Sequence, residues 1–113
     1  MSKDIHFDRE ALTVLEEIME DEFPLLIRAY ITDSDSRIST MNHALSNNDF
    51  DELRETAHSF KGTSGNLSAN VLAKLCFSLE QQSGEEDFEK MSALVQSVEQ
   101  EYTVVKSILV AML

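Results

Sequence analysis

Apolar residues recur at spacings of three and four along most of this chain, which is the period of an amphipathic helix. The longest pattern spans 25 residues near the C-terminus, at Phe88, Met91, Val95, Val98, Tyr102, Val105, Leu109 and Met112. As a helix it would be about 37 Å long. No segment shows the two-residue alternation of a β-strand. The pattern therefore predicts an all-α protein.

The first half of the sequence predicts two helices. A short helix begins after Asp8, whose side chain can cap it, and runs to about Asp21. Pro24 suits the first turn of a second helix better than the interior of the first. The Asn47-Asn48 pair ends this second helix, and the polar run Asp33 to Arg37 interrupts its apolar stripe. That run resembles a calcium loop, but it lacks the glycine and the closing glutamate, so we interpret it as a polar helix face.

Two more helices fill the middle of the chain. The third is expected from about Asp49 to Gly65, with Asn66 ending it. Ser68 can cap a fourth helix, and Gly84 is a natural stop for that helix.

These helices are expected to form one domain over residues 1–113. The length is enough for one hydrophobic core, and three glycines and one proline are few for a β-sandwich. Short loops between long amphipathic helices predict an antiparallel up-down four-helix bundle with a short additional N-terminal helix. The last stripe could instead be a homodimer seam, but bundle helices use the same seam geometry, so we expect a monomer.

Charge and cysteine content narrow the possible functions. The formal charge of −12 disfavours nucleic acid and anionic membrane surfaces as partners. The N-terminus lacks the apolar core of a signal peptide, and no stretch approaches a membrane span. Cys76, the one cysteine, lies in an apolar run and is expected to be buried. The sequence thus predicts a cytoplasmic protein.

The third predicted helix carries a histidine on a different face from its apolar stripe. Its apolar stripe comprises Phe50, Leu53, Ala57, Phe60, Ser64 and Leu67, and His58 points roughly 120° away from the stripe. Arg54, Gly62 and Gly65 lie within about 40° of the His58 direction, and Lys61 about 60° to one side. Glycine inside a helix costs about 1 kcal/mol relative to alanine. Two glycines on this face would let another protein's backbone approach the imidazole closely.

An exposed imidazole at this position has a specific chemical use. Neutral imidazole is a good nucleophile and can attack and hold a phosphoryl group. Lys61 would place an ammonium beside the resulting anion, and Arg54 could add a weaker positive contribution. The alternative is an ordinary polar surface histidine. The chain has no Walker-type phosphate loop, so the phosphoryl group would have to come from another protein.

Other combinations of residues offer weaker candidate sites. His6, His43 and Cys76 have no partners at the spacing of a zinc site, so no metal site is expected. The acidic clusters at Asp51-Glu52 and at residues 85–87 are interpreted as solvated helix starts rather than as catalytic acid pairs.

The segment around the histidine resembles a known family. His58-Ser-Phe-Lys61-Gly62-Thr63-Ser64, followed by Leu67 and Ala69, is similar to the His-x-Leu-Lys-Gly-Ser-Ser block and trailing Leu-Gly-Ala of histidine-containing phosphotransfer (HPt) domains of two-component phosphorelays. The resemblance covers essentially the whole chain, including the order of five helices. The initiating methionine and full set of helices predict a stand-alone bacterial member rather than a fragment of a hybrid kinase.

The resemblance implies a role for each residue of the block. His58 would be the phosphorylated residue, and Lys61 would stabilise the phosphoryl group. The docking surface would comprise Arg54, Gly62, Gly65, Leu15 and Met19. The partners would be receiver domains of a hybrid sensor kinase and of a response regulator, which would also supply any magnesium. The protein would be a phosphocarrier without its own ATP site rather than an enzyme.

Two positions depart from the family pattern. Ser68 replaces the usual glycine of Leu-Gly-Ala, which indicates that a helix cap has replaced a flexible turn. Some members carry a fourth-helix glutamine near the histidine. That register falls on Glu80, followed by Gln81 and Gln82, and which of the three reaches His58 stays open. A competing hypothesis is a non-catalytic adaptor or dimerisation bundle that uses the same face only for binding.

Overall fold

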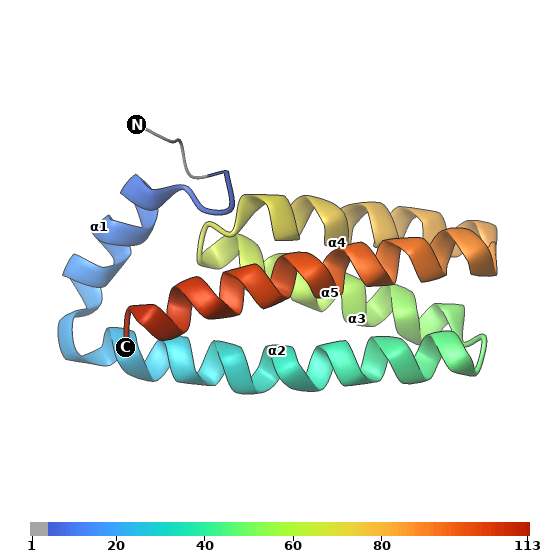
Figure 1. Cartoon of the computed structure of the whole chain (residues 1–113), viewed down its shortest axis with the longest axis horizontal. Helices are drawn as coiled ribbons and strands as arrows, with labels where there is room; N and C mark the ends of the chain where they lie inside the picture. The colour runs from blue at the N-terminus through green and yellow to red at the C-terminus, as the bar shows by residue number, and fades with distance from the viewer. Residues whose placement is uncertain (1–4) are drawn as a thin grey trace.

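The computed structural model describes residues 5–113, which form helices and turns with no strand. The elements are α1 (Arg9–Met19), the 3₁₀ helix η1 (Glu20–Glu22), α2 (Phe23–Ser46), α3 (Phe50–Asn66), α4 (Asn70–Gln82), the 3₁₀ helix η2 (Ser83–Glu85) and α5 (Phe88–Ala111). Helices α2 to α5 lie side by side and alternate in direction, while α1 is steeply inclined to them at one end (Figure 1). The predicted bundle with a short additional helix is confirmed.

The beginning of α1 follows the sequence signal and its end does not. The Asp8 side chain caps the helix by accepting a hydrogen bond from the Ala11 N–H at 3.1 Å, as predicted. The helix ends at Met19 rather than near Asp21, because Glu20 adopts a φ of 50° that breaks the α-helical path. The chain then passes through η1 into α2, and Pro24 occupies the first turn of α2 as expected.

The turn between α3 and α4 differs from the prediction for Ser68. This residue adopts a φ of 62°, in the left-handed region that glycine takes most readily. Ala69, not Ser68, occupies the N-cap position of α4, and no side chain caps that helix. The predicted serine cap is therefore wrong: Ser68 adopts a left-handed backbone conformation in the turn before α4. Its carbonyl accepts a hydrogen bond from the Asp8 N–H at 2.9 Å, which ties the start of α1 to this turn.

The end of α4 also uses a different residue from the one expected. Gly84 lies inside η2 with an ordinary φ, and the left-handed position is Glu86, with a φ of 54°. The Ser83 hydroxyl donates to the Leu79 carbonyl at 2.7 Å, which satisfies an acceptor at the end of α4. The helix stop thus comes from Ser83 and Glu86 rather than from Gly84.

The core is filled by side chains from all the helices, with an aromatic cluster at its centre. Its largest fully buried side chains are Phe60, Leu12, Ile27, Met41, Leu53, Leu72, Leu79, Met91, Leu109, Val95, Val98 and Val105. The Phe60 ring packs against Tyr30 and Tyr102, with ring centroids 6.4 and 5.7 Å away. The Tyr30 hydroxyl forms a hydrogen bond with the Ser64 hydroxyl at 2.8 Å, and burial raises the pKa of Tyr30 to about 12.

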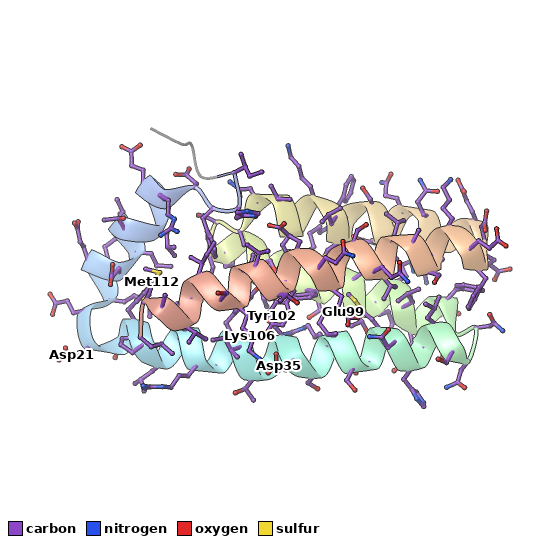
Figure 2. The ribbon with its side chains drawn as sticks, viewed as in Figure 1. Asp21, Asp35, Glu99, Tyr102, Lys106 and Met112 are labelled. Atoms are coloured by element: carbon purple, nitrogen blue, oxygen red, sulfur yellow. The ribbon has the colours of Figure 1, made fainter. Side chains whose placement is uncertain are left out.

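The polar run in α2 forms a largely exposed polar face, as expected, and it also bonds to neighbouring helices. Ser34 is fully buried, so the apolar stripe continues through a small side chain. The Asp35 carboxylate accepts hydrogen bonds from Tyr102 at 2.7 Å and from Lys106 at 3.0 Å, both in α5 (Figure 2). The hydrogen bond from Tyr102, with help from Lys106, lowers the pKa of Asp35. Arg37 bonds to Ser59 of α3.

Burial of the α5 stripe decides between bundle and homodimer seam. The six stripe residues from Met91 to Leu109 are buried inside the bundle, whereas Phe88 at its start is 47% exposed. The stripe therefore belongs to the core of one chain.

Cys76 is also fully buried, as expected, and burial raises the pKa of its thiol to about 12. Within residues 5–113, no helix is long and apolar enough to cross a membrane.

Candidate functional site

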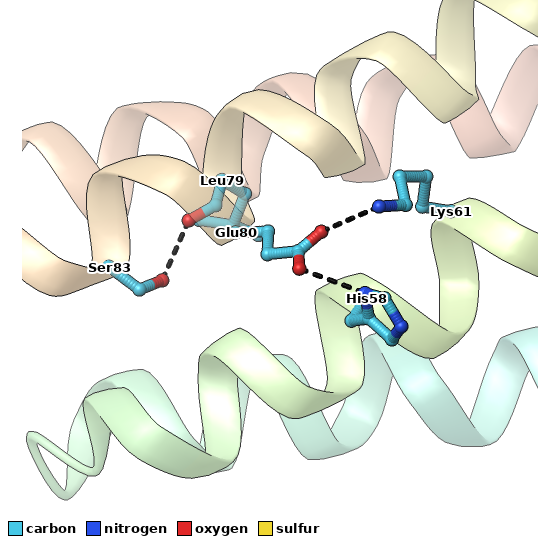
Figure 3. Close-up of polar contacts among 5 residues, drawn as sticks. All are labelled: His58, Lys61, Leu79, Glu80 and Ser83. Atoms are coloured by element: carbon cyan, nitrogen blue, oxygen red, sulfur yellow. Dashed lines mark hydrogen bonds and ion pairs between the residues drawn. The ribbon is translucent and has the colours of Figure 1, made fainter.

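Three polar side chains meet where α3 and α4 lie side by side. His58 and Lys61 come from consecutive turns of α3, and Glu80 reaches them from α4 (Figure 3). One carboxylate oxygen of Glu80 lies 2.8 Å from His58 Nδ1, and the other lies 2.9 Å from Lys61 Nζ. A single carboxylate therefore holds both side chains that the sequence singled out.

This contact sets the tautomer of His58. A carboxylate can only accept a hydrogen bond, so Nδ1 must carry the proton that it donates to Glu80. In the neutral ring the second nitrogen, Nε2, then has a free lone pair, and it lies on the side of the ring away from Glu80 (Figure 3). Because 66% of the His58 side chain is exposed, a partner can reach this nitrogen from solvent.

Glu80 is held in its charged form. The hydrogen bond from Lys61 is the largest effect lowering the pKa of this carboxyl, and the hydrogen bond from His58 acts in the same direction. The sequence left open whether Glu80, Gln81 or Gln82 reaches His58. In the structure Glu80 makes this contact. Gln81 is exposed, and the structure records no contact between Gln82 and His58.

Lys61 has a second neighbour that sequence reasoning missed. Its ammonium lies 5.2 Å from the centroid of the Phe77 ring, in a cation–π contact. Phe77 is 46% exposed although it is large and apolar. Phe77 lies one turn before Glu80 in α4. From the sequence, this spacing of three residues could have indicated that the two side chains are neighbours on the helix surface.

The other predicted site residues on α3 lie on the same helix without joining the three-residue contact. The Arg54 guanidinium forms an ion pair with Asp51, one turn earlier, at 3.4 Å. A Cβ atom added to Gly62 or to Gly65 would meet nothing within 4 Å. The fold itself therefore does not require glycine at these two positions, and both leave open space on the helix surface.

The comparisons with known proteins show the family to which this fold belongs. The family model of the Hpt domain matches residues 25–106, which include all three contacting residues. The chain belongs to the Hpt domain family. The fold matches the crystal structure of histidine-containing phosphotransfer protein B (HptB) from Pseudomonas aeruginosa PAO1 with a TM-score of 0.92 and 35% identity. That match covers 97% of this chain and 96% of the HptB chain. The comparison with curated proteins gave no match.

Membership in the Hpt family establishes the general role of the chain as a histidine phosphotransfer protein of a phosphorelay. Proteins of this family are phosphocarriers rather than enzymes with an ATP site of their own. Within residues 5–113 of this Hpt domain, no group of three His, Cys, Asp or Glu side chains is placed to hold a metal ion.

A largely apolar cavity of about 260 Å³ borders the histidine-bearing helix of the Hpt domain. Its lining comes from three helices and comprises Leu15, Leu26, Ala29, Tyr30, Asp33, Arg37, Thr63, Asn66 and Leu67. Arg37 connects it to the site, because its guanidinium donates two hydrogen bonds, at 3.0 and 3.2 Å, to Ser59, the residue after His58. Of the two α1 residues in the predicted docking surface, Leu15 lines this cavity, whereas Met19 packs against the core without lining it.

Proposed function

We propose that His58 Nε2 accepts a phosphoryl group from a receiver-domain aspartate and passes it to a second receiver domain. The Nε2 lone pair attacks the phosphorus while the bond from phosphorus to the aspartate oxygen breaks, and the aspartate leaves as a carboxylate. The Nδ1 proton stays on the ring. In the second step a carboxylate oxygen of the next receiver attacks the phosphorus, and the electron pair of the N–P bond returns to Nε2.

One observation carries this proposal: Glu80 contacts Nδ1 of His58, and the exposed ring leaves Nε2 as the nitrogen that a partner can reach. The hydrogen bond from Nδ1 to Glu80 fixes the tautomer, and the exposed ring presents Nε2 to a partner. Lys61, one turn away, supplies the positive charge that an incoming phosphoryl group requires.

The test is incubation of the full chain with receiver domains carrying a labelled aspartyl phosphate. Transfer of label to the chain, and its release to a second unlabelled receiver, is the expected result. Binding without transfer of label from any receiver would favour the adaptor hypothesis instead. Reversing donor and acceptor in the same assay measures the preferred direction of phosphoryl flow.

We further propose that the receiver covers Gly62, Gly65 and the neighbouring cavity. An apolar side chain of the receiver fits the cavity, whose Leu15 and Leu26 walls are partly buried in the free chain. The net charge of −12 favours a basic receiver surface around that side chain. We expect the receiver to bring the magnesium ion that supports transfer, as the family resemblance implies.

Filling the space at Gly62 is expected to block docking without harming the fold. The variant Gly62→Leu should fold with equal or higher stability, because leucine favours helices and its Cβ would meet nothing within 4 Å. Transfer from a receiver should fall about 100-fold, since small displacements of reacting atoms cost that much. The small donor phosphoramidate should still label His58. The control Gly84→Leu, also in open space, should transfer normally; normal transfer by Gly62→Leu would contradict the docking proposal.

Removing the Lys61 ammonium is expected to slow transfer while leaving the bundle intact. A charge-assisted hydrogen bond contributes about 1.5–3 kcal/mol, so Lys61→Ala should reduce the transfer rate by roughly tenfold or more. Rapid-quench measurements with a labelled receiver give the rate, and circular dichroism checks the fold. Loss of helical signal would show instead that Lys61 has a structural role.

A further inference from the structure

We propose that Glu80 keeps the phosphorylated state of His58 short-lived and ready for transfer, as a positioning residue that acts through both His58 and Lys61. This inference rests on the proposed function of His58 and adds regulation of the same site. It starts from one arrangement: the two oxygens of one carboxylate contact the ring nitrogen at 2.8 Å and the ammonium at 2.9 Å.

The first effect of Glu80 concerns the proton on Nδ1. When Nε2 bonds to phosphorus and Nδ1 keeps its proton, the ring becomes a cation. A carboxylate 2.8 Å from Nδ1 stabilises that cation and therefore retains the proton. In the protonated form, cleavage of the N–P bond releases a neutral imidazole. Without the proton it would release an imidazolate anion, a far poorer leaving group, so retention of the proton keeps the phosphoryl group transferable.

The second effect concerns the charge available to the phosphoryl group. In the resting site the Lys61 ammonium is already paired with Glu80, whose side chain is only 22% exposed. A phosphoryl group on Nε2 must compete with this carboxylate for Lys61, and it also experiences the carboxylate's own negative charge. Both interactions favour loss of the phosphoryl group, compared with an uncharged residue at this position. The retained proton favours the same loss, because it makes the imidazole a better leaving group.

A glutamine at this position would behave differently. Its amide oxygen can still accept a hydrogen bond from Nδ1, so the tautomer of the resting histidine would be kept. It carries no charge, however, so it would neither hold the proton on the phosphorylated ring nor compete with the phosphoryl group for Lys61. Glu80→Gln therefore separates the effect of charge from the effect of ring orientation.

The experiment loads the full chain with phosphoramidate, which avoids any dependence on a receiver, and follows loss of phosphohistidine at pH 7.5. Glu80→Gln is expected to lengthen the half-life about tenfold and to slow onward transfer, because a neighbouring charge shifts proton affinity by that factor or more.

Nitrogen NMR of the labelled ring gives a direct readout: Nδ1 of the phosphorylated wild type should stay protonated to higher pH than in Glu80→Gln. Among charged side chains, Glu80 of α4 contacts this ring, and Lys61, Arg54 and Glu55 lie within about one turn of His58 on α3.

A matched control removes a carboxylate from elsewhere on the surface. Glu17→Gln, at an exposed position of α1, should leave the half-life and the titration unchanged. Equal half-lives for wild type and Glu80→Gln, or a shorter one for the variant, would overturn this inference while the proposed function stands. If neither phosphoramidate nor any receiver labels His58 in the wild type, the proposed function itself fails.

Discussion

Replacement of His58 by glutamine is expected to abolish phosphoryl acceptance, with the labelled fraction falling below detection. Glutamine has a similar reach, and its amide can donate to Glu80, but it offers no nitrogen lone pair that can attack phosphorus. Because 66% of the His58 side chain is exposed, the change should alter the free energy of unfolding by less than about 0.5 kcal/mol. Labelling by receiver and by phosphoramidate, followed by urea unfolding, checks both statements.

His43→Gln is the matched control for this substitution. His43 is also exposed on a helix, and its ring bonds to Asn47, the C-cap residue of α2, rather than to any residue of the site. This variant should accept and pass on the label like the wild type. Label retained on His58→Gln, or lost from His43→Gln, would mean that the phosphorylated residue has been wrongly assigned.

The largest loss of stability is expected from Phe60→Ala. Phe60 is fully buried, and its ring packs edge-on against Tyr102 at 5.7 Å and tilted against Tyr30 at 6.4 Å. Truncation of a buried phenylalanine costs about 3–5 kcal/mol, because the transfer free energy is lost and a cavity remains. Domains of this size unfold with about 5–15 kcal/mol, so the loss should amount to at least about a fifth of the stability and could reach all of it. Urea denaturation followed by circular dichroism measures the loss.

Phe88→Ala provides the comparison for Phe60→Ala. Phe88 is the first residue of α5 and is 47% exposed, so its truncation should cost less than about 1 kcal/mol. Similar midpoints for the two variants would contradict the central role given to the aromatic cluster. Because Phe60 lies between Ser59 and Lys61 in α3, slower phosphotransfer by Phe60→Ala below its unfolding midpoint would show that the core also holds the site in place.

Much of the fold was predictable because its signals are local. The cap at Asp8, the proline at the start of α2 and the regular stripe of α5 each depend on residues within a few turns. The same holds for the face of α3 that carries His58 and Lys61, since helix periodicity alone places them together. The pairing of the two with one carboxylate did not follow from periodicity.

The features that escaped prediction depend on packing between elements. Selecting Glu80 over its two glutamine neighbours requires the rotation of α4 against α3, which no local pattern specifies. The left-handed conformation of Ser68 follows from the tight turn that joins these helices, although serine more often caps a helix. The cavity is bordered by residues of α1, α2 and the end of α3, and sequence reasoning had assigned only Leu15 of its lining to a docking surface.

Because of the short turn at Ser68, the reactive site and the cavity are built mainly from different parts of the chain. The turn makes α3 and α4 one helical hairpin, and His58, Lys61 and Glu80 all belong to that hairpin, within 22 residues of one another. Contacts at such short sequence separation form quickly during folding, so the reactive centre can assemble without waiting for the distant termini. The cavity takes most of its lining from α1 and α2 instead. Under the proposed docking, substitutions in those two helices would therefore change which receiver binds while His58, Lys61 and Glu80 stay the same.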